Sequence, residues 1–306
     1  MKKLTLLVVS LLATAAAAGP EPATRATAVH RPVLLAMATP PQGAPTSAPQ
    51  TDSQPAASAT VQPADQLLKA LLSGNMTAQE ERRIGNRIAG HFLGAVKLVP
   101  DPALQRYVNL VGNWVAQQGE RPSLPWRFGV VDSDDINAFA APGGYIFVTK
   151  GLYRRLADEA DLAAVLGHEI GHVIQKHHIK VMQQSQIIAA AAGALGQQFK
   201  DEDQLIQSLV GNGAEILARS LDKEAEFEAD RVGMILAARA GYDAHALPKV
   251  LEDIGHVSDK DSRIALLFKT HPRPADRLDH LREAVGNRLD DLPAGKTLGQ
   301  RFYRLP

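Results

Sequence analysis

Residues 167–178, GHEIGHVIQKHH, place four histidines and one glutamate within twelve residues. On a helix that turns about 100° per residue, His168 and His172 project from one face, one turn apart, so their ring nitrogens can converge on a single ion. Glu169 lies beside them and can reach a metal-bound water without binding the metal itself. This His-Glu-x-x-His spacing is typical of zinc peptidase helices, in which the glutamate is the general base.

The same stretch holds two more histidines, His177 and His178. If the helix continues, they lie about 140° and about 120° from His172 in opposite directions, more than a turn along the axis, so neither shares the ion. His178 has the spacing of the third ligand in the metzincin pattern, but that pattern requires glycine where this chain has Gln175. Both are therefore interpreted as helix-end histidines favoured by the helix dipole.

A third ligand must come from elsewhere in the chain, because a catalytic zinc site needs three protein ligands and one open position. The segment EAEFEADRVG, residues 224–233, offers Glu226 and Asp230 on one helix face. Glu226 would bind the metal, and Asp230 would accept a hydrogen bond from the outer nitrogen of a ligating histidine and fix its tautomer. Glu224 and Glu228 lie off that face. The alternative interpretation of this stretch is a solvated acidic surface.

The composition limits the chemistry of the chain. None of its 306 residues is cysteine, which excludes disulfides, iron–sulfur sites, thiol nucleophiles and a lipid anchor on cysteine, so any metal must be held by histidine and carboxylates. Lys and Arg together number 33, as do Asp and Glu, and no basic run is present. The charge therefore gives no reason to expect nucleic acid as a partner.

The first 63 residues differ from the rest of the chain. Residues 1–18, MKKLTLLVVSLLATAAAA, have the pattern of a secretory signal peptide cleaved after Ala18. The alternative is an uncleaved anchor, although the apolar run is shorter than the ~20 residues that span a bilayer. Residues 19–63 hold nine of the nineteen prolines and no aromatic residue, and predict a disordered linker. We expect an exported protein, periplasmic in a bacterium, without a stable membrane span in the mature chain.

The remaining sequence predicts an α+β fold that is mainly helical, with a catalytic domain over residues 64–290 and a C-terminal tail over 291–306. Two β-rich runs, 126–133 and 138–151, predict a small sheet beside the metal-binding helix. The apolar segment 187–196 is too short to span a membrane and is interpreted as a buried or loosely packed helix, with a membrane-touching flap as the alternative. Helical periodicity is found in residues 64–72, 77–98, 103–118, 158–183, 201–219, 222–240, 244–256 and 275–287.

Four motifs together resemble one group of metalloproteases. In chain order they are NAFAAPGGYIFVTKGL at 137–152, HEIGH at 168–172, EFEAD at 226–230 and THPRPADR at 270–277. Over residues 76–285 the chain is similar to the gluzincin zinc metalloproteases, which include CAAX prenyl proteases, HtpX-like membrane peptidases and BepA-like periplasmic proteins. The soluble BepA-like branch fits best, because no transmembrane segments flank the motif. Its tetratricopeptide domain is not expected, since about twenty residues follow the last predicted helix.

The resemblance implies a gluzincin-type domain with one zinc ion (Zn2+) per chain, bound by His168, His172 and Glu226. In some relatives the histidine that matches His271 approaches the zinc. This implies either a fourth ligand that keeps the enzyme latent or a donor to the oxyanion formed during catalysis. A loop histidine that caps the next helix is the alternative. Arg277, on the first turns of that helix, is expected to brace the loop or to face the site.

The segment GGYIFV, residues 143–148, is predicted to be an edge strand that binds substrate as an added strand, with an ordinary core strand as the alternative. Asn137 would orient the substrate backbone or form a turn. Pairing through backbone hydrogen bonds depends on few side chains of the substrate, so we expect unfolded or misassembled proteins as substrates. The resemblance also implies the outer-membrane assembly machinery as a partner. The predicted substrate-binding residues of the segment are Gly143, Gly144, Tyr145 and Ile146.

These features predict an exported zinc endopeptidase of envelope protein quality control, in which Glu169 activates a zinc-bound water. The alternative is a periplasmic chaperone or assembly factor with a latent metal site. A binding protein with a structural zinc fits less well, because a structural site needs a fourth protein ligand and has no use for Glu169.

Overall fold

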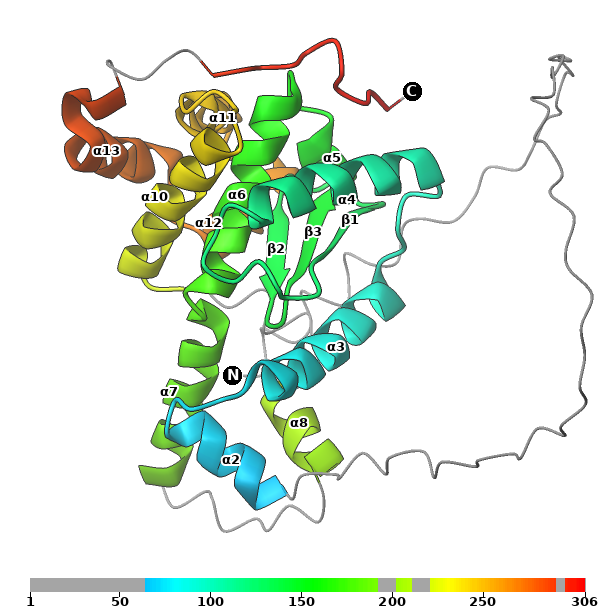
Figure 1. Ribbon diagram of the computed structural model, residues 1–306, viewed down its shortest axis with the longest axis vertical. Coiled ribbons are helices and arrows are strands. Elements are labelled where there is room, and N and C mark those ends of the chain that lie inside the picture. Colours follow the sequence, from blue (N-terminus) through cyan, green and yellow to red (C-terminus); the bar gives the residue numbers. More distant parts are fainter. Residues whose placement is uncertain (1–63, 192–201, 211–220, 290–294, 306) are drawn as a thin grey trace, which may run out of the picture. The chain divides into compact units, whose positions relative to one another are not determined.

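A computed structural model of the chain describes residues 64–191, 202–210, 221–289 and 295–305 (Figure 1). They belong to one unit of the chain, residues 59–306. The predicted signal peptide and linker lie outside the described residues, as do residues 192–196 of the apolar segment. Within the described part, no helix has the length and apolar character needed to cross a bilayer.

Three short strands form one mixed sheet: β1 (Arg127–Val131), β2 (Ala138–Ala141) and β3 (Tyr145–Thr149). β3 lies in the centre, parallel to β1 and antiparallel to β2. The turn between β2 and β3 contains Gly143 and Gly144 with φ of 77° and 98°, a region that residues with a Cβ rarely adopt. The prediction that residues 143–148 form an edge strand is wrong, because β1 pairs with the side of β3 that was expected to be open.

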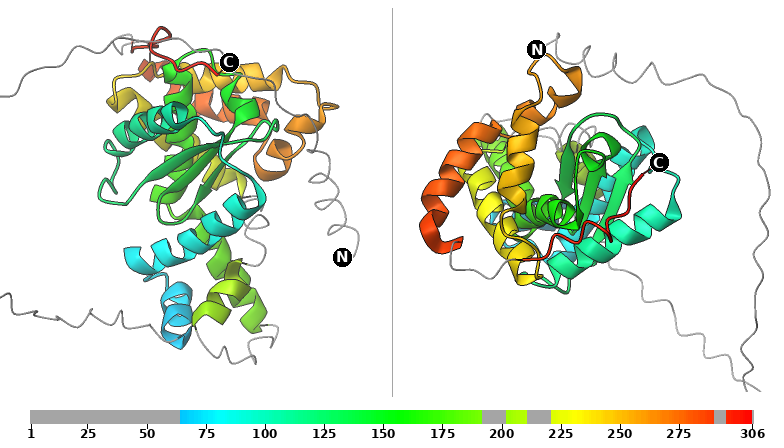
Figure 2. Two further views of the ribbon diagram at one scale, coloured as in Figure 1. Left: turned by 90° about the vertical axis from the view of Figure 1, so that its right-hand side faces the viewer. Right: turned by 90° about the horizontal axis from the view of Figure 1, so that it is seen from above.

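Helix α6 (Glu159–Ile174) carries the His-Glu-x-x-His motif, and all of its residues are buried. It packs against β2 and against three helices: α4 (Pro102–Ala116), α10 (Lys223–Arg239) and α11 (Ala246–Gly255). Seen from above in Figure 2, α6 stands between the sheet and the pair α10 and α11. The Asp158 side chain caps the start of α6 by accepting a hydrogen bond from the backbone N–H of Asp161 at 3.0 Å. The motif is therefore held inside the main core.

Helices α6 and α10 pack backbone against backbone. A Cβ added to Gly167 would lie 2.7 Å from the carbonyl oxygen of Gly233, and a Cβ added to Gly233 would lie 2.5 Å from the backbone nitrogen of His168. One turn along, a Cβ on Gly171 would lie 3.1 Å from the carbonyl oxygen of Ala229. Only residues without side chains allow this approach, which brings the acidic turn of α10 against the histidines of α6.

A second apolar cluster covers the other face of the sheet. It is formed with Phe139 and Phe147 by α2 (Ala64–Leu72), α3 (Ala78–Ala95), α7 (His177–Ala191) and α8 (Glu202–Val210). Helix α3 follows the N-cap Thr77, close to the start predicted from the sequence, and the Glu80 side chain accepts a 2.7 Å hydrogen bond from the backbone N–H of Thr77. This capping box explains why the helix starts where it does.

The helix predicted over residues 158–183 is divided into α6 and α7. Helix α6 ends at Ile174, Lys176 has a φ of 56°, and α7 begins at the next residue. A left-handed residue redirects the chain, so the prediction of one continuous helix is wrong. Lysine is a good helix former, and the sequence therefore gives no sign of this break.

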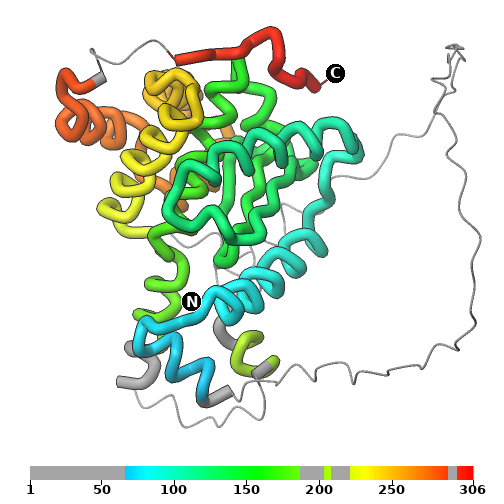
Figure 3. The backbone as a smooth tube through the Cα atoms, in the orientation of Figure 1, coloured from blue at the N-terminus to red at the C-terminus, as the bar shows by residue number. Residues whose placement is uncertain are grey.

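The C-terminal elements enclose the site and the start of α6. After α11 the chain forms two short helices, η2 (Ser262–Ile264) and α12 (Leu267–Thr270), and then α13 (Pro274–Val285), which continues into η3 (Gly286–Leu289). One further short helix, α5 (Lys150–Tyr153), lies earlier in the chain, between β3 and α6. Residues 295–305 then pass over the first turn of α6 (Figure 3). Arg301 Nε donates to the fully buried Glu159 carboxylate at 2.7 Å, and the hydroxyls of Tyr107 and Tyr242 donate to the same group. Although burial opposes the charge, Arg301 and the two tyrosines hold the pKa of Glu159 below its usual value.

The contact between Gly167 and Gly233 predicts the effect of one methyl group. Gly233→Ala should lower the free energy of unfolding by about 1–3 kcal/mol, since the new Cβ meets backbone that cannot rotate away. The matched control is Gly90→Ala in α3, where no heavy atom lies within 4 Å and alanine favours the helix. Thermal unfolding of both variants checks this. A melting temperature of Gly233→Ala equal to that of the unaltered chain would contradict the close packing.

Candidate active site

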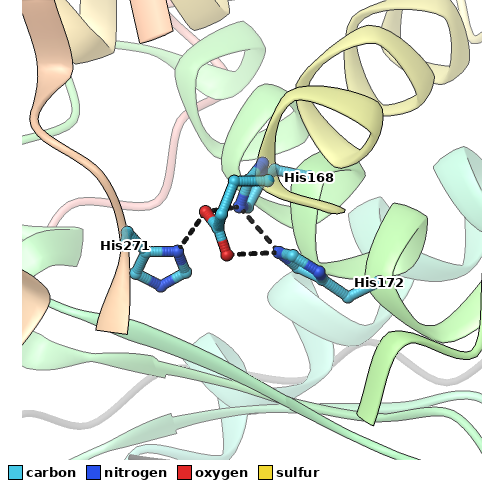
Figure 4. A group of neighbouring side chains, drawn as sticks. His168, His172 and His271 are labelled. Atoms are coloured by element: carbon cyan, nitrogen blue, oxygen red, sulfur yellow. Dashed lines mark hydrogen bonds and ion pairs between the residues drawn. The ribbon is translucent and has the colours of Figure 1, made fainter. Parts of the chain in front are cut away.

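Four side chains from separate elements converge on one point: His168 and His172 from α6, Glu226 from α10, and His271 just after α12. Their potential ligand atoms all lie within 4.8 Å of one another. The Nε2 atoms of His168 and His172 are 3.0 Å apart, and the Glu226 carboxylate lies 3.7 Å from the first and 3.5 Å from the second. Figure 4 shows the three imidazoles turned toward the same carboxylate.

The donor set fits a zinc ion. Glu226 is fully buried, and its Oε1 has no hydrogen-bond partner. A buried carboxylate oxygen without a donor costs free energy, which a cation beside it would offset. Two imidazoles and one carboxylate are ligands that zinc uses in peptidase sites. His168, His172 and Glu226 can therefore hold the metal predicted from the sequence.

Asp230 and Arg277 surround the outer side of His168. His168 Nδ1 lies 2.8 Å from Asp230 Oδ1, while Arg277 Nε donates to Asp230 Oδ2 at 2.9 Å. All three side chains are buried. Arg277 Nη2 also lies 3.2 Å from His168 Nδ1, but the contact with Asp230 is the shorter of the two. Since a carboxylate only accepts, we assign the proton of His168 to Nδ1, which leaves a lone pair on Nε2 for the metal. Although burial opposes it, Arg277 and His168 hold the pKa of Asp230 well below its usual range. Arg277 thus braces Asp230.

Glu169 is buried at the same point. Its side chain lines a cavity together with His172, Glu226 and His271. Burial raises the pKa of Glu169 above that of a free glutamate. A carboxylate whose pKa moves toward neutrality can both take a proton and give it back near pH 7, which is the property of a general base that later serves as acid.

Residues 102–285 match the sequence model of peptidase family M48. The chain belongs to this family. The matched residues include the whole metal cluster, Glu169, Asp230 and Arg277. Membership confirms three predictions: the metallopeptidase class, a metal cofactor, and a mainly helical fold with a small sheet.

Individual M48 relatives resemble this chain to different extents. It is 30% identical over 235 residues to the beta-barrel assembly-enhancing protease of Yersinia pestis, covering 74% of this chain and 48% of the relative. It is 26% identical over 216 residues to the metalloprotease YcaL of Escherichia coli, covering 70% and 75% respectively. It is 31% identical over 161 residues to the mitochondrial metalloendopeptidase OMA1 of Arabidopsis thaliana, covering 53% and 32%. The chain spans about half the length of the assembly-enhancing proteases that it matches.

Two histidines of this M48 domain have surroundings that the sequence did not predict. His177 is buried, and its Nδ1 lies 2.8 Å from Nδ1 of His172. His178 is nearly buried and lines the metal cavity, where burial lowers its pKa to about 4. The interpretation of both as helix-end histidines is wrong, because it assumed that α6 continues through Lys176.

Strand β2, not β3, borders the M48 metal cavity, which Ala138, Phe139 and Ala140 line. Asn137 is fully buried just before β2, and its Oδ1 accepts a 2.9 Å hydrogen bond from the backbone N–H of Ala138.

The residues predicted to bind substrate along β3 lie elsewhere. The backbone N–H of Gly143 donates to Glu81, the Tyr145 hydroxyl donates to Asn86, and Ile146 belongs to the main core. None of the four, Gly144 included, is among the residues that line the metal cavity. The prediction placed them at the site because residues 143–148 were expected to form the edge strand beside the cleft, whereas β3 is the central strand and β2 is the strand that borders the cavity.

Proposed function

We propose that this M48 chain is a zinc endopeptidase that cleaves extended or misfolded proteins in the bacterial envelope. The observation that carries the proposal is the buried convergence of His168, His172 and Glu226, with the unpartnered Glu226 Oε1 and with Glu169 lining the same cavity. A metal-dependent peptidase needs this combination of a metal site, which activates water and polarises the scissile carbonyl, and an adjacent general base.

The residues have separate tasks in this mechanism. Zinc, when held by His168, His172 and Glu226, supplies a Lewis acid and a water of lowered pKa. The Glu169 carboxylate would act as the general base, accepting a proton from the attacking water and donating it to the nitrogen of the leaving amine. Asp230 keeps the His168 proton on Nδ1 throughout, and the buried walls exclude bulk water from the proton transfer.

The free edge of β2 supports an extended substrate. Thr149 N–H donates to the Asn137 carbonyl at 3.0 Å, so by the alternation of an antiparallel pair Ala138 and Ala140 direct their backbone groups away from β3. The Asn137 side chain caps the N–H of Ala138, which leaves the N–H and C=O of Ala140 for a substrate strand. Among the described residues, no strand pairs with this edge. Recognition through backbone groups depends on few side chains of the substrate, so misfolded proteins of different sequence could bind in the same way.

His271 fits the role of a latch. Its Nδ1 lies 2.7 Å from Glu226 Oε2, and its ring lines the metal cavity beside Glu169. In this position His271 completes the ligand cluster with a fourth donor, which would fill the position that substrate and water need. The enzyme is then latent until the loop after α12 moves.

Location and partners follow from the N-terminal pattern and from the relatives. Residues 1–18 have the features of a signal peptide, and the relatives include beta-barrel assembly-enhancing proteases. We place the chain in the periplasm, acting on unassembled outer-membrane proteins near their assembly machinery. The contact between His271 and Glu226 also favours a second candidate function. If His271 stays in the ligand cluster, the protein would be a chaperone or assembly factor whose metal site remains latent.

The role of Glu169 is tested by one isosteric change. Glu169→Gln should keep about one zinc per chain but lose casein hydrolysis by roughly 10²- to 10⁴-fold, because it removes the base and no ligand. His168→Ala and Glu226→Ala should instead lose the metal. Metal analysis and a casein digest with and without chelator measure both properties. Loss of zinc from Glu169→Gln would contradict its role as base, and retained client binding without any hydrolysis in the unaltered protein would favour the chaperone.

Binding of substrate along the free edge of β2 is tested at Ala140. Ala140→Pro removes the outward N–H and should raise KM for an extended peptide by roughly 2- to 10-fold, the value of about one hydrogen bond. Zinc content should not change. Ala140→Gly, which keeps the N–H, is the control. An equal increase of KM in both variants would assign the effect to lost packing and not to strand pairing.

The latch is tested by His271→Ala. A latch predicts faster proteolysis, an oxyanion donor predicts a loss of ~10²-fold or more in kcat, and a helix-capping histidine predicts little change. We expect faster proteolysis. The control is His256→Ala, which alters an exposed histidine at the end of α11. An unchanged rate, with unchanged zinc content and melting temperature, would remove His271 from the site.

A further inference from the structure

A chain of three polar side chains leads from the metal cluster to the surface of α10. His172 turns Nε2 toward His168 and Glu226, and its other nitrogen, Nδ1, lies 2.8 Å from Nδ1 of His177. The Nε2 of His177 lies 3.1 Å from Oε2 of Glu228. Both histidines are buried, whereas 38% of the Glu228 side chain is exposed.

The direction of each hydrogen bond in this chain follows when each imidazole carries one proton, which is the state in which a histidine binds a metal. A carboxylate only accepts, so the Nε2 of His177 carries the proton and donates a hydrogen bond to Glu228. In a neutral, buried imidazole the other nitrogen is then an acceptor, and His177 Nδ1 accepts from Nδ1 of His172. His172 therefore carries its proton on Nδ1, and its Nε2 presents a lone pair to the metal cluster. The opposite tautomer of His172 would place a proton where the metal binds.

We propose that His177 and Glu228 are positioning residues that hold His172 in its metal-binding tautomer and orientation, and that they thereby set the affinity of the site for zinc. The proposal rests on the zinc site of the proposed function. Outer partners of ligating histidines have this effect in general, and their removal weakens metal binding by about 10- to 100-fold.

The two ligating histidines are held in different ways by the same helix. His168 contacts the buried carboxylate of Asp230 directly, whereas His172 reaches Glu228 only through His177. Glu226, Glu228 and Asp230 all belong to α10, so one helix supplies a ligand and both outer carboxylates. Glu228 lies about 200° around α10 from Glu226 and cannot reach the cluster itself.

The hydrogen-bonded chain from His172 through His177 to Glu228, called the relay below, depends on the break between α6 and α7. On a continuous helix His177 would lie about 140° around the axis from His172 and would point away from it. The left-handed Lys176, with a φ of 56°, instead returns the chain so that the two rings meet edge to face, with centroids 5.0 Å apart. A backbone conformation that is unfavourable for lysine is thus used to place His177.

Zinc affinity of the metal-loaded protein, measured by competition with a chromophoric chelator, tests the proposal without using proteolysis. His177→Leu should weaken zinc binding by about 10- to 100-fold, and Glu228→Ala by a smaller factor. Glu224→Ala, which removes an exposed carboxylate from the first turn of the same helix, is the control and should bind zinc as the unaltered chain does.

A conservative variant separates positioning from packing. In His177→Asn the amide oxygen can take the place of Nδ1 and accept from His172, so most of the affinity should return. Adding Glu228→Ala to His177→Asn should then have no further effect, because the link to Glu228 is already broken. A purely structural role would lower the melting temperature of the chelated proteins and leave zinc affinity unchanged.

Several results would overturn the relay. They are unchanged zinc affinity in His177→Leu or in Glu228→Ala, or a full effect of Glu228→Ala in the His177→Asn background. If His177→Leu does not fold, Glu228→Ala at the exposed end still decides the question. A chain that binds zinc but cleaves nothing would refute the proposed peptidase while leaving the relay to be judged on affinity. A chain that binds no zinc would refute both.

Discussion

The contact between the backbones of α6 and α10 is the constraint on which the site depends. Because Gly167 and Gly233 have no side chains, nothing separates the two helices at that level. The carboxylates of Glu226 and Asp230 are short and reach the histidines of α6 only across this small gap. The ligand, the outer carboxylates and the base are therefore set by one helix pair, and the remaining elements close the cavity around them.

The parts of the site that depend on local periodicity could be predicted from the sequence. His168 and His172 lie one turn apart on a helix, as do Glu226 and Asp230, and both helices begin within one residue of the start that the apolar spacing predicted. The strand order could not be predicted, because β1 pairs with β3 through contacts that are distant in sequence. The position of His177 depends on the left-handed conformation of Lys176, and neither glycine nor proline, the residues that usually indicate the end of a helix, lies next to it.

The centre of the domain contains an unusual concentration of buried ionisable groups. Glu169, Glu226, Asp230, His271 and Arg277 are all largely removed from water. Such a cluster is expensive in free energy unless each charge has a partner. Arg277 donates hydrogen bonds to Asp230, and His271 lies within hydrogen-bond distance of one oxygen of Glu226, while the other oxygen has no hydrogen-bond partner. The fold tolerates this cost because large apolar clusters lie on both sides of the sheet.

The ion pair between Glu159 and Arg301 bears on how the protein is made. Glu159 opens the metal-binding helix and is fully buried, yet the guanidinium that neutralises it lies 142 residues later in the chain. A chain emerges from its N-terminus onward, at the ribosome and during export alike, and domains complete their folding as units. Helix α6 can therefore acquire its final environment only after Arg301 has emerged. A chain interrupted before Arg301 would hold both histidines of the motif on a helix whose first turn carries a buried carboxylate without its guanidinium partner, so the metal-binding helix is complete in sequence well before it is complete in structure.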